Sequence, residues 1–452
     1  MLFGLTSLGF GMLIAIALIL IRSPFPGVSI FDDELFRVFL VLHVDLSILV
    51  WYLSFAGCLV THIIGGGTSS GWFALGGSFL GTLLMLVAAV SGYGQPQLSN
   101  YLPVIDSPLF LVGLVVFLIS ALVSMARMFW LYNSWALLRS APMAGFILYC
   151  AALIVVAALL TVCITYARLP IGIRDDGGFY EQLFWGAGHL FQSVYTLLML
   201  VVWFLFVDRY KKRESSHHLW MKLLVLAMTL PALSSLWVAV NESPLSVEYR
   251  LFYTSLMRYS SWLAVPFSAV ILIQSLLGSS RDFLQSLLTR TLLASVLLFA
   301  VGIIAGLLIR GDSLMVPAHY HGTTGAINLA FMAVVYQCFS KELKHQKFLR
   351  SISRQPIIYS CGLLLMVSGF AWSGYHGTLR KVAGVEQGFN SPAEMIGMLV
   401  AGVGGLLALF GLFQFIVTIL FRLKAPTIVK LSVNYQSNQC VTEKPKLADF
   451  DE

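Results

Sequence analysis

Long apolar segments follow one another along almost the whole chain, separated by short polar connections. Each segment is about 20 residues or longer, the length that an α-helix needs to cross the hydrocarbon core of a bilayer. We therefore expect an all-α, polytopic membrane protein, with a membrane domain over residues 1–430 and a polar, disordered tail over residues 431–452. The pattern predicts twelve membrane-spanning helices, near residues 3–22, 36–64, 71–92, 108–131, 143–167, 180–207, 219–240, 249–278, 289–310, 314–339, 356–375 and 394–421.

Composition supports this pattern and excludes other classes. Hydrophobic residues make up 58% of the 452 residues, and charged residues make up only 11%, less than half the roughly 25% of soluble domains. The net charge of +7 reflects basic residues in the connections, so we expect the lipid bilayer and no nucleic acid as a partner. The six cysteines form no CxxC or CxxCH sequence, so neither a thiolate metal site nor covalently attached c-type heme is expected.

Basic connections alternate with acidic or mixed ones. Residues 208–213, 341–350 and 422–430 are rich in lysine and arginine, whereas residues 32–34 and 174–176 carry acidic side chains. The positive-inside rule places the basic set, and with it both termini, in the cytoplasm. We expect the protein to lie in the cytoplasmic membrane of a bacterium.

Four histidines fall in one layer of this expected membrane domain. In the topology above, His43, His189, His319 and His321 all lie in the outer half of the bilayer, on three different helices. Ionisable or metal-binding groups inside a membrane are costly and mark functional sites. The alternative is that each imidazole bonds to a neighbouring helix, but the matched depth favours a shared site. Imidazole is the commonest axial ligand of protein heme, and it also binds copper.

His319 and His321 are two positions apart near one end of the expected helix 314–339. Residues i and i+2 of a helix point roughly 200° apart, so these two rings cannot chelate one metal together. They can serve two partners, one on each side of the helix. A noncovalent heme between helices needs such a ligand, apolar walls and a cation for its propionates. Arg380 and Lys381 could supply that cation, although an ordinary interfacial basic pair is the alternative.

Together these features resemble the catalytic subunit, subunit I, of the heme-copper oxidase superfamily, which covers respiratory terminal oxidases and nitric oxide reductases. The resemblance runs over nearly the whole chain. It rests on the twelve-helix pattern, a histidine in the second helix, Trp185-Gly186-Ala187-Gly188-His189 in the sixth and His319-Tyr320-His321 in the tenth. It implies two noncovalent hemes of unknown type, with Arg380 and Lys381 as the propionate-binding pair.

The resemblance also assigns roles to the histidines. It implies that His43 and His321 are the two axial ligands of a low-spin heme, and that His319 is the proximal ligand of a high-spin heme. His189 matches the sixth-helix ligand of the active-site copper, or of the non-heme iron in the reductases. His319 and His189 would then be the catalytic pair.

One segment departs from the family pattern. The family supplies two adjacent histidines from the outer end of the seventh helix as further ligands of the second metal. Here residues 236–244 contain no histidine, and Asn241 and Glu242 are the only nearby groups able to bind a metal. A three-imidazole copper site cannot be built from this segment. His189 with Glu242 could hold iron weakly, so copper or non-heme iron at this position stays open.

The resemblance implies a heme-containing membrane oxidoreductase that passes electrons through the low-spin heme to the high-spin heme, where O2 or NO is reduced. The alternative is a diverged, copper-deficient heme protein of the same fold that transfers electrons or senses a gas without efficient turnover. A twelve-helix transporter is a third hypothesis, under which the histidine layer would be a coincidence. Because the sequence contains no electron-entry module, the expected donor is a partner subunit with a cytochrome c or cupredoxin centre, or a quinol.

Overall fold

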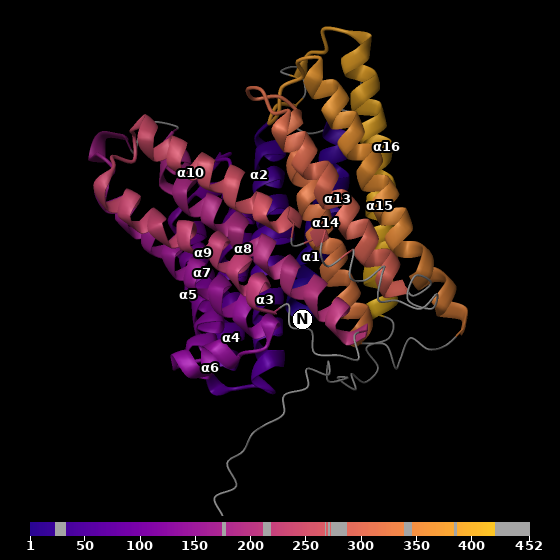
Figure 1. Cartoon of the computed structure of the whole chain (residues 1–452). Coiled ribbons are helices and arrows are strands. Elements are labelled where there is room, and N and C mark those ends of the chain that lie inside the picture. The colour runs from indigo at the N-terminus through magenta and orange to yellow at the C-terminus, as the bar shows by residue number, and fades with distance from the viewer. Residues whose placement is uncertain are drawn as a thin grey trace, which may run out of the picture.

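The computed structural model describes residues 1–22, 33–173, 178–210, 218–266, 268–269, 272, 287–338, 346–383 and 387–420, most of them in long helices (Figure 1). The long helices are α1 (Leu2–Ile21), α2 (Asp33–Val44), α3 (Trp51–Ile64), α4 (Ser69–Ser91), α5 (Pro108–Leu131), α7 (Met143–Arg168), α8 (Phe179–Tyr210), α9 (His218–Asn241), α10 (Val247–Ser260), α13 (Leu287–Leu307), α14 (Met315–Cys338), α15 (Gln346–Tyr375) and α16 (Pro392–Leu420). The shorter elements are the helix α6 (Trp135–Ser140), the π-helical segment η1 (Asp45–Val50), the 3-10 turns η2 (Ile171–Ile173) and η3 (Ser261–Leu263), and the strands β1 (Gln95–Gln97) and β2 (Val104–Asp106).

The polytopic helical fold is confirmed, whereas the count of twelve is not. Ten helices in the described chain are long and apolar enough to cross a membrane, with α2, η1 and α3 forming one continuous span, Asp33–Ile64. The expected span 314–339 is the helix α14, but its histidine, tyrosine, threonine and asparagine side chains leave it outside these ten. The expected span 249–278 begins as α10 and then enters residues outside the described ranges, where the expected tail over residues 431–452 also falls.

The helices form two groups that meet along a central seam. The helices from α4 to α10 lie on one side and α13 to α16 on the other, with α1 and α2 between them (Figure 1). Neighbours in sequence pack along each other, as α4 does with α5, α7 with α8, α13 with α14, and α15 with α16. The span in α8 is the most deeply buried of the ten, and α8 contacts α14 across the seam.

A short hairpin joins α4 to α5 and enters the bundle. Strands β1 and β2 pair antiparallel, with Gln95 opposite Asp106 and Gln97 opposite Val104. Residues 98–103 form the tip of this hairpin. The ring of Tyr101, at the tip, packs against the aromatic side chains of α8. The hairpin thereby brings a loop residue to the seam between the two groups of helices.

Two facing glycines set the distance between the helices that carry the hairpin. A Cβ placed on Gly81 of α4 would lie 2.6 Å from the carbonyl oxygen of Gly113 and 2.6 Å from the amide nitrogen of Phe117, both in α5. A Cβ on Gly113 would lie 2.7 Å from the carbonyl oxygen of Gly81. Helices in lipid associate through such small residues because burial of apolar surface gives little driving force there.

We expect Gly81→Ala to lower the free energy of unfolding by about 1–3 kcal/mol, because the added methyl group must push α4 away from α5. Gly76 lies on the same helix with open space around its Cβ position, so Gly76→Ala is the matched control. The control should unfold at the same temperature as the wild type or higher, because alanine favours the helix. Thermal unfolding of the detergent-purified proteins measures the difference, and equal midpoints for the two variants would contradict this account.

Candidate functional site

A cavity of about 810 Å³ lies at the seam, with mainly apolar walls. Its lining comes from both groups of helices and from α1 and α2. Five of the residues expected at the functional site line it: His43, His319, His321, Arg380 and Lys381. Segments more than 300 residues apart in the sequence, such as α2 and the loop after α15, therefore meet at one place.

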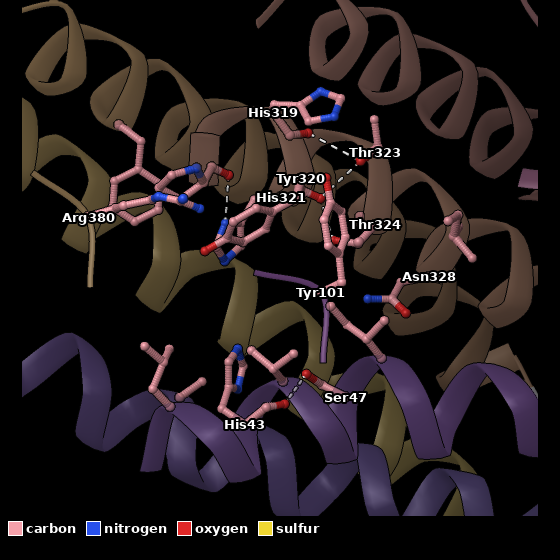
Figure 2. Close-up of a pocket in the computed structure, with 18 of the residues that line it drawn as sticks. His43, Ser47, Tyr101, His319, Tyr320, His321, Thr323, Thr324, Asn328 and Arg380 are labelled. Atoms are coloured by element: carbon pink, nitrogen blue, oxygen red, sulfur yellow. Dashed lines mark hydrogen bonds between the residues drawn. The ribbon is translucent and has the colours of Figure 1, made fainter. Parts of the chain in front are cut away.

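His43 and His321 lie on opposite walls of the cavity (Figure 2). His43 stands near the end of α2, and its Nδ1 lies 3.0 Å from the carbonyl oxygen of Gly11 in α1. His321 stands in the second turn of α14, and its Nδ1 lies 2.8 Å from the carbonyl oxygen of Pro317. A carbonyl oxygen only accepts hydrogen bonds, so each Nδ1 carries the hydrogen and donates it. Each Nε2 is left with a lone pair, as an axial ligand requires.

His319 lies on the other side of α14 from His321 (Figure 2). Its Nδ1 donates to the carbonyl oxygen of Gly302 in α13 at 2.7 Å, which again leaves the lone pair on Nε2. Gly306, one turn further along α13, makes room for the ring, because a Cβ there would lie 2.6 Å from His319 Nδ1. Gly302 thus binds this imidazole through its carbonyl oxygen, and Gly306 leaves space for the ring.

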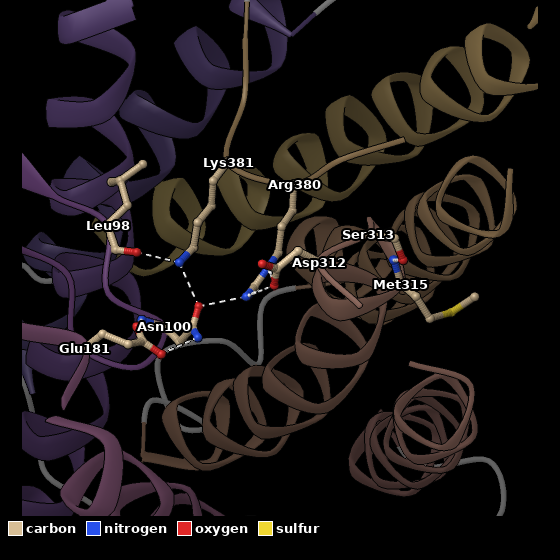
Figure 3. A network of polar contacts seen from close by, with 8 residues as sticks. All are labelled: Leu98, Asn100, Glu181, Asp312, Ser313, Met315, Arg380 and Lys381. Carbon is tan, nitrogen blue, oxygen red and sulfur yellow. Dashed lines mark hydrogen bonds and ion pairs between the residues drawn. The ribbon is translucent and has the colours of Figure 1, made fainter. Parts of the chain in front are cut away.

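Arg380 and Lys381 reach from the loop after α15 to the hairpin tip (Figure 3). Arg380 pairs with Asp312 at 2.7 Å and donates to Asn100 Oδ1 at 2.8 Å. Lys381 Nζ donates to the same Asn100 oxygen at 2.7 Å and to the carbonyl oxygen of Leu98. The backbone of Lys381 has φ 61°, a strained conformation for a residue other than glycine, so surrounding contacts must hold it in place.

The positive charges at this end of the cavity exceed the negative ones beside them. The pKa of the Lys381 amine is lowered to about 8, first by burial and then by the adjacent Arg380, while Glu181 and Asp312 act in the opposite direction. Burial also lowers the pKa of the Arg22 guanidinium to about 10, against the effect of Tyr320. Arg22 lines the same cavity. A bound carboxylate would relieve these penalties, since buried charges require partners.

Asp45 adds a buried carboxyl group to the cavity wall. It is the first residue of the π-helical segment η1, two positions after His43, and it is fully buried. Neither of its carboxylate oxygens has a hydrogen-bond partner among the described residues. An unpaired buried carboxyl group is costly, and π-helical turns occur often at functional sites. In the sequence, only its position two residues after His43 connects Asp45 with the other site residues.

His189 and Glu242 do not line the cavity. His189 is buried in α8, with Nδ1 2.6 Å from the carbonyl oxygen of Trp185 and Nε2 2.8 Å from the Tyr101 hydroxyl. Glu242 follows the end of α9, where its backbone carbonyl accepts a hydrogen bond from Arg168. Within the described part of the chain, no three histidine, cysteine, aspartate or glutamate side chains gather as metal ligands would. This donor set does not fit a copper or non-heme iron centre.

Tyr101 is the site residue that the sequence did not indicate. It lines the cavity, whereas its partner His189 does not. The two residues are 88 positions apart, and Tyr101 belongs to a loop with no periodic pattern. Only the tertiary position of the hairpin reveals the pair.

Comparisons with known proteins agree with the arrangement of the cavity. A family model described as cytochrome c and quinol oxidase polypeptide I matches residues 1–407. A heme-copper terminal oxidase, solved by cryo-electron microscopy as a dimer, has the same fold with a TM-score of 0.75. The match covers 94% of this chain and 83% of that chain at 20% sequence identity, so it supports the fold alone.

Two curated relatives are uncharacterized proteins. One is RP382 of Rickettsia prowazekii (strain Madrid E), which is 25% identical over an alignment of 490 residues that covers 91% of this chain and 93% of the relative. The other is from Aquifex aeolicus (strain VF5), with 26% identity over 358 residues, covering 75% of this chain and 84% of the relative.

The family match extends from the first residue into α16 and includes all the histidines on the cavity. The same chain carries the many apolar helices of a multi-pass membrane protein. The protein therefore belongs to the heme-copper oxidase family, as a polypeptide I of the cytochrome c and quinol oxidases, and is a membrane oxidoreductase of that class.

Proposed function

We propose that the cavity holds two noncovalent hemes, one between His43 and His321 and one on His319. Electrons would pass through the first to the second, where a small gas, O2 or NO, is reduced. The observation that carries this proposal is the set of three imidazoles on one apolar cavity, each with its Nδ1 hydrogen given to a backbone carbonyl. When bound, heme iron supplies one-electron chemistry and, at an open axial position, binding of a diatomic gas.

The hydrogen bonds to Gly11, Pro317 and Gly302 support the ligand assignment. Each fixes the orientation of a ring and places its lone pair on Nε2. Donation from Nδ1 also raises the basicity of the other nitrogen, which strengthens a bond to iron. A histidine kept only for packing would need no such uniform arrangement at three places.

The positions of the three rings support two different heme environments. His43 and His321 oppose each other across the cavity, which suits a six-coordinate heme with no room for a gas. His319 faces the other side of α14, and the described cavity lining contains no further imidazole to oppose it. That position suits a five-coordinate heme with one face open to a ligand.

Arg380, Lys381 and Arg22 support the placement of the heme carboxylates. All three line the cavity, and the lowered pKa of Lys381 reflects burial of its ammonium next to Arg380. Propionates at this end would pair with these cations, which guanidinium and ammonium groups do well. We propose further that this end faces the outer side of a bacterial cytoplasmic membrane, with both termini in the cytoplasm.

A second candidate function is a heme protein that transfers electrons or senses a gas without efficient turnover. The lack of a three-ligand metal group among the described residues favours it. The two candidates share their hemes and differ in the chemistry opposite His319. Either one needs an electron donor, for which we propose a partner subunit with a cytochrome c or cupredoxin centre, or a quinol. The transporter hypothesis is not needed for a member of an oxidase family.

We expect His321→Ala and His43→Ala to remove most of the low-spin signal from reduced-minus-oxidised optical spectra while leaving CO binding in place. His319→Ala should do the opposite, because it removes the ligand of the heme with the open face. His376→Ala is the control, since this exposed histidine lies beyond α15 and should change neither signal. A wild-type protein purified without heme would contradict the proposed function. Loss of CO binding in His321→Ala alone would mean that the two ligands are exchanged.

We expect Lys381→Gln to lower the midpoint potential of a heme, because the positive charge of Lys381 stabilises the reduced state and the substitution removes it. An interaction of about 1 kcal/mol between this charge and the heme corresponds to roughly 40 mV for one electron. Lys381→Arg keeps the charge and should shift the potential much less. The difference between wild type and Lys381→Gln should shrink at a pH above the pKa of Lys381, because the wild type then loses the same charge. A redox titration gives these values, and equal potentials at neutral pH would place the propionates elsewhere.

A further inference from the structure

We propose that Tyr101 occupies the place at which the family holds its second metal, so that a phenol–imidazole pair, Tyr101 with His189, stands opposite the heme of His319 and no metal is bound there. This inference rests on the proposed function for its heme. It concerns the part of the site that the family resemblance left open. Tyr101 then becomes a polar group that the cavity offers to a gas on that heme.

The hydrogen bonds of His189 engage the lone pair that a metal would need. The carbonyl oxygen of Trp185 lies 2.6 Å from Nδ1 and can only accept, so in the neutral ring Nδ1 carries the hydrogen. Nε2 therefore accepts, and the Tyr101 hydroxyl, 2.8 Å away, donates to it. Both nitrogens of this buried imidazole are satisfied without a metal.

The packing around His189 leaves space for the ring of Tyr101. A Cβ on Gly188 would lie 2.1 Å from the Cβ of Tyr101, so only glycine lets the hairpin tip rest on α8 at this point. The ring of Tyr101 lies with its centroid 4.4 Å from that of His189, and the ring of Trp185 lies 4.9 Å from the same imidazole. Aromatic rings therefore fill the space on two sides of His189.

Two further tyrosines occupy the neighbouring space between α8, α9 and α10. Tyr249 and Tyr253 are fully buried, and Tyr253 donates to the carbonyl oxygen of Ser235 in α9 at 3.1 Å. A Cβ on Gly186 would lie 2.6 Å from the Tyr249 hydroxyl. The side of α8 on which the family places additional ligands from its seventh helix is thus filled with tyrosine rings and hydroxyl groups. Phenols with such partners are poor substitutes for imidazole at a copper centre.

The position of Tyr101 gives it a role toward the cavity as well as toward His189. Tyr101 lines the cavity together with His319, while His189 lies behind it. The adjacent Asn100 borders a second, polar cavity of about 440 Å³, which also reaches Glu181 and Trp185. Rotation about the phenol C–O bond would turn the hydroxyl hydrogen from Nε2 toward a ligand in the main cavity. The pair therefore offers the Tyr101 hydroxyl as a hydrogen-bond donor to a bound gas.

Metal analysis of the heme-loaded protein is the first part of the test. We expect iron equal to the measured heme, and copper far below one per protein, also after incubation of the reduced protein with copper or ferrous iron. One additional copper or iron per protein that is lost in His189→Ala would overturn the inference, because it would require Tyr101 to leave Nε2. This measurement shows whether a metal binds at His189 even if the number of hemes differs from the proposed two.

Ligand binding to Tyr101→Phe is the second part. Loss of one hydrogen bond should weaken cyanide binding to the oxidised protein by roughly 2- to 10-fold. Tyr93→Phe is the matched control, because Tyr93 is 77% exposed at the end of α4, and it should bind cyanide as the wild type does. Equal cyanide affinity in Tyr101→Phe and wild type would overturn the proposal that the phenol of Tyr101 lies opposite the heme of His319. A wild type that binds neither heme nor cyanide would instead defeat the proposed function.

Discussion

The hydrogen bond from an imidazole Nδ1 to a backbone carbonyl is the interaction on which the whole site depends. It occurs at His43, His189, His319 and His321, each time with a carbonyl oxygen that helix geometry or a neighbouring helix holds in place. A carbonyl oxygen can only accept, so each of these bonds fixes the hydrogen of the neutral ring on Nδ1 and the fold sets the tautomer. What differs among the four is the partner left for Nε2, and that difference separates the three imidazoles of the cavity from His189, whose Nε2 accepts from Tyr101.

Close helix contacts make these hydrogen bonds possible. Gly302 and Gly306 bring α13 near enough to α14 to bond and accommodate His319, and Gly188 lets the hairpin touch α8. Gly81 and Gly113 hold together the two helices from which the hairpin emerges. Small residues in this protein thus do more than stabilise the bundle, because they determine which backbone oxygens and side chains reach the imidazoles.

Features that follow helix periodicity could be predicted from the sequence. The opposite orientation of His319 and His321 comes directly from their spacing, and the polytopic helical fold from the length of the apolar runs. The polar side chains of α14, including His319 and His321, also keep that helix below the hydropathy of a typical span. The family match over residues 1–407 agrees with the resemblance that these motifs indicated.

Features that depend on tertiary position were not accessible. Tyr101 comes from a loop tip, and no local pattern connects it with α8. Asp45 begins a π-helical segment and has no hydrogen-bond partner among the described residues, and the apolar pattern of the span indicates neither feature. Likewise, the expected histidine layer included His189, and Glu242 was its candidate metal partner from residues 236–244, but neither residue lines the cavity.

The hairpin tip contacts two parts of the site at once. Leu98 and Asn100 bind the two cations at one end of the cavity, and the next residue, Tyr101, binds His189. A single peptide bond thus separates Asn100, which binds both cations, from Tyr101, which binds His189. Strands β1 and β2 join the tip to α4 and α5, which are closely packed at Gly81 and Gly113. The contacts that place the two cations and the contact that engages His189 therefore depend on the same short segment of backbone.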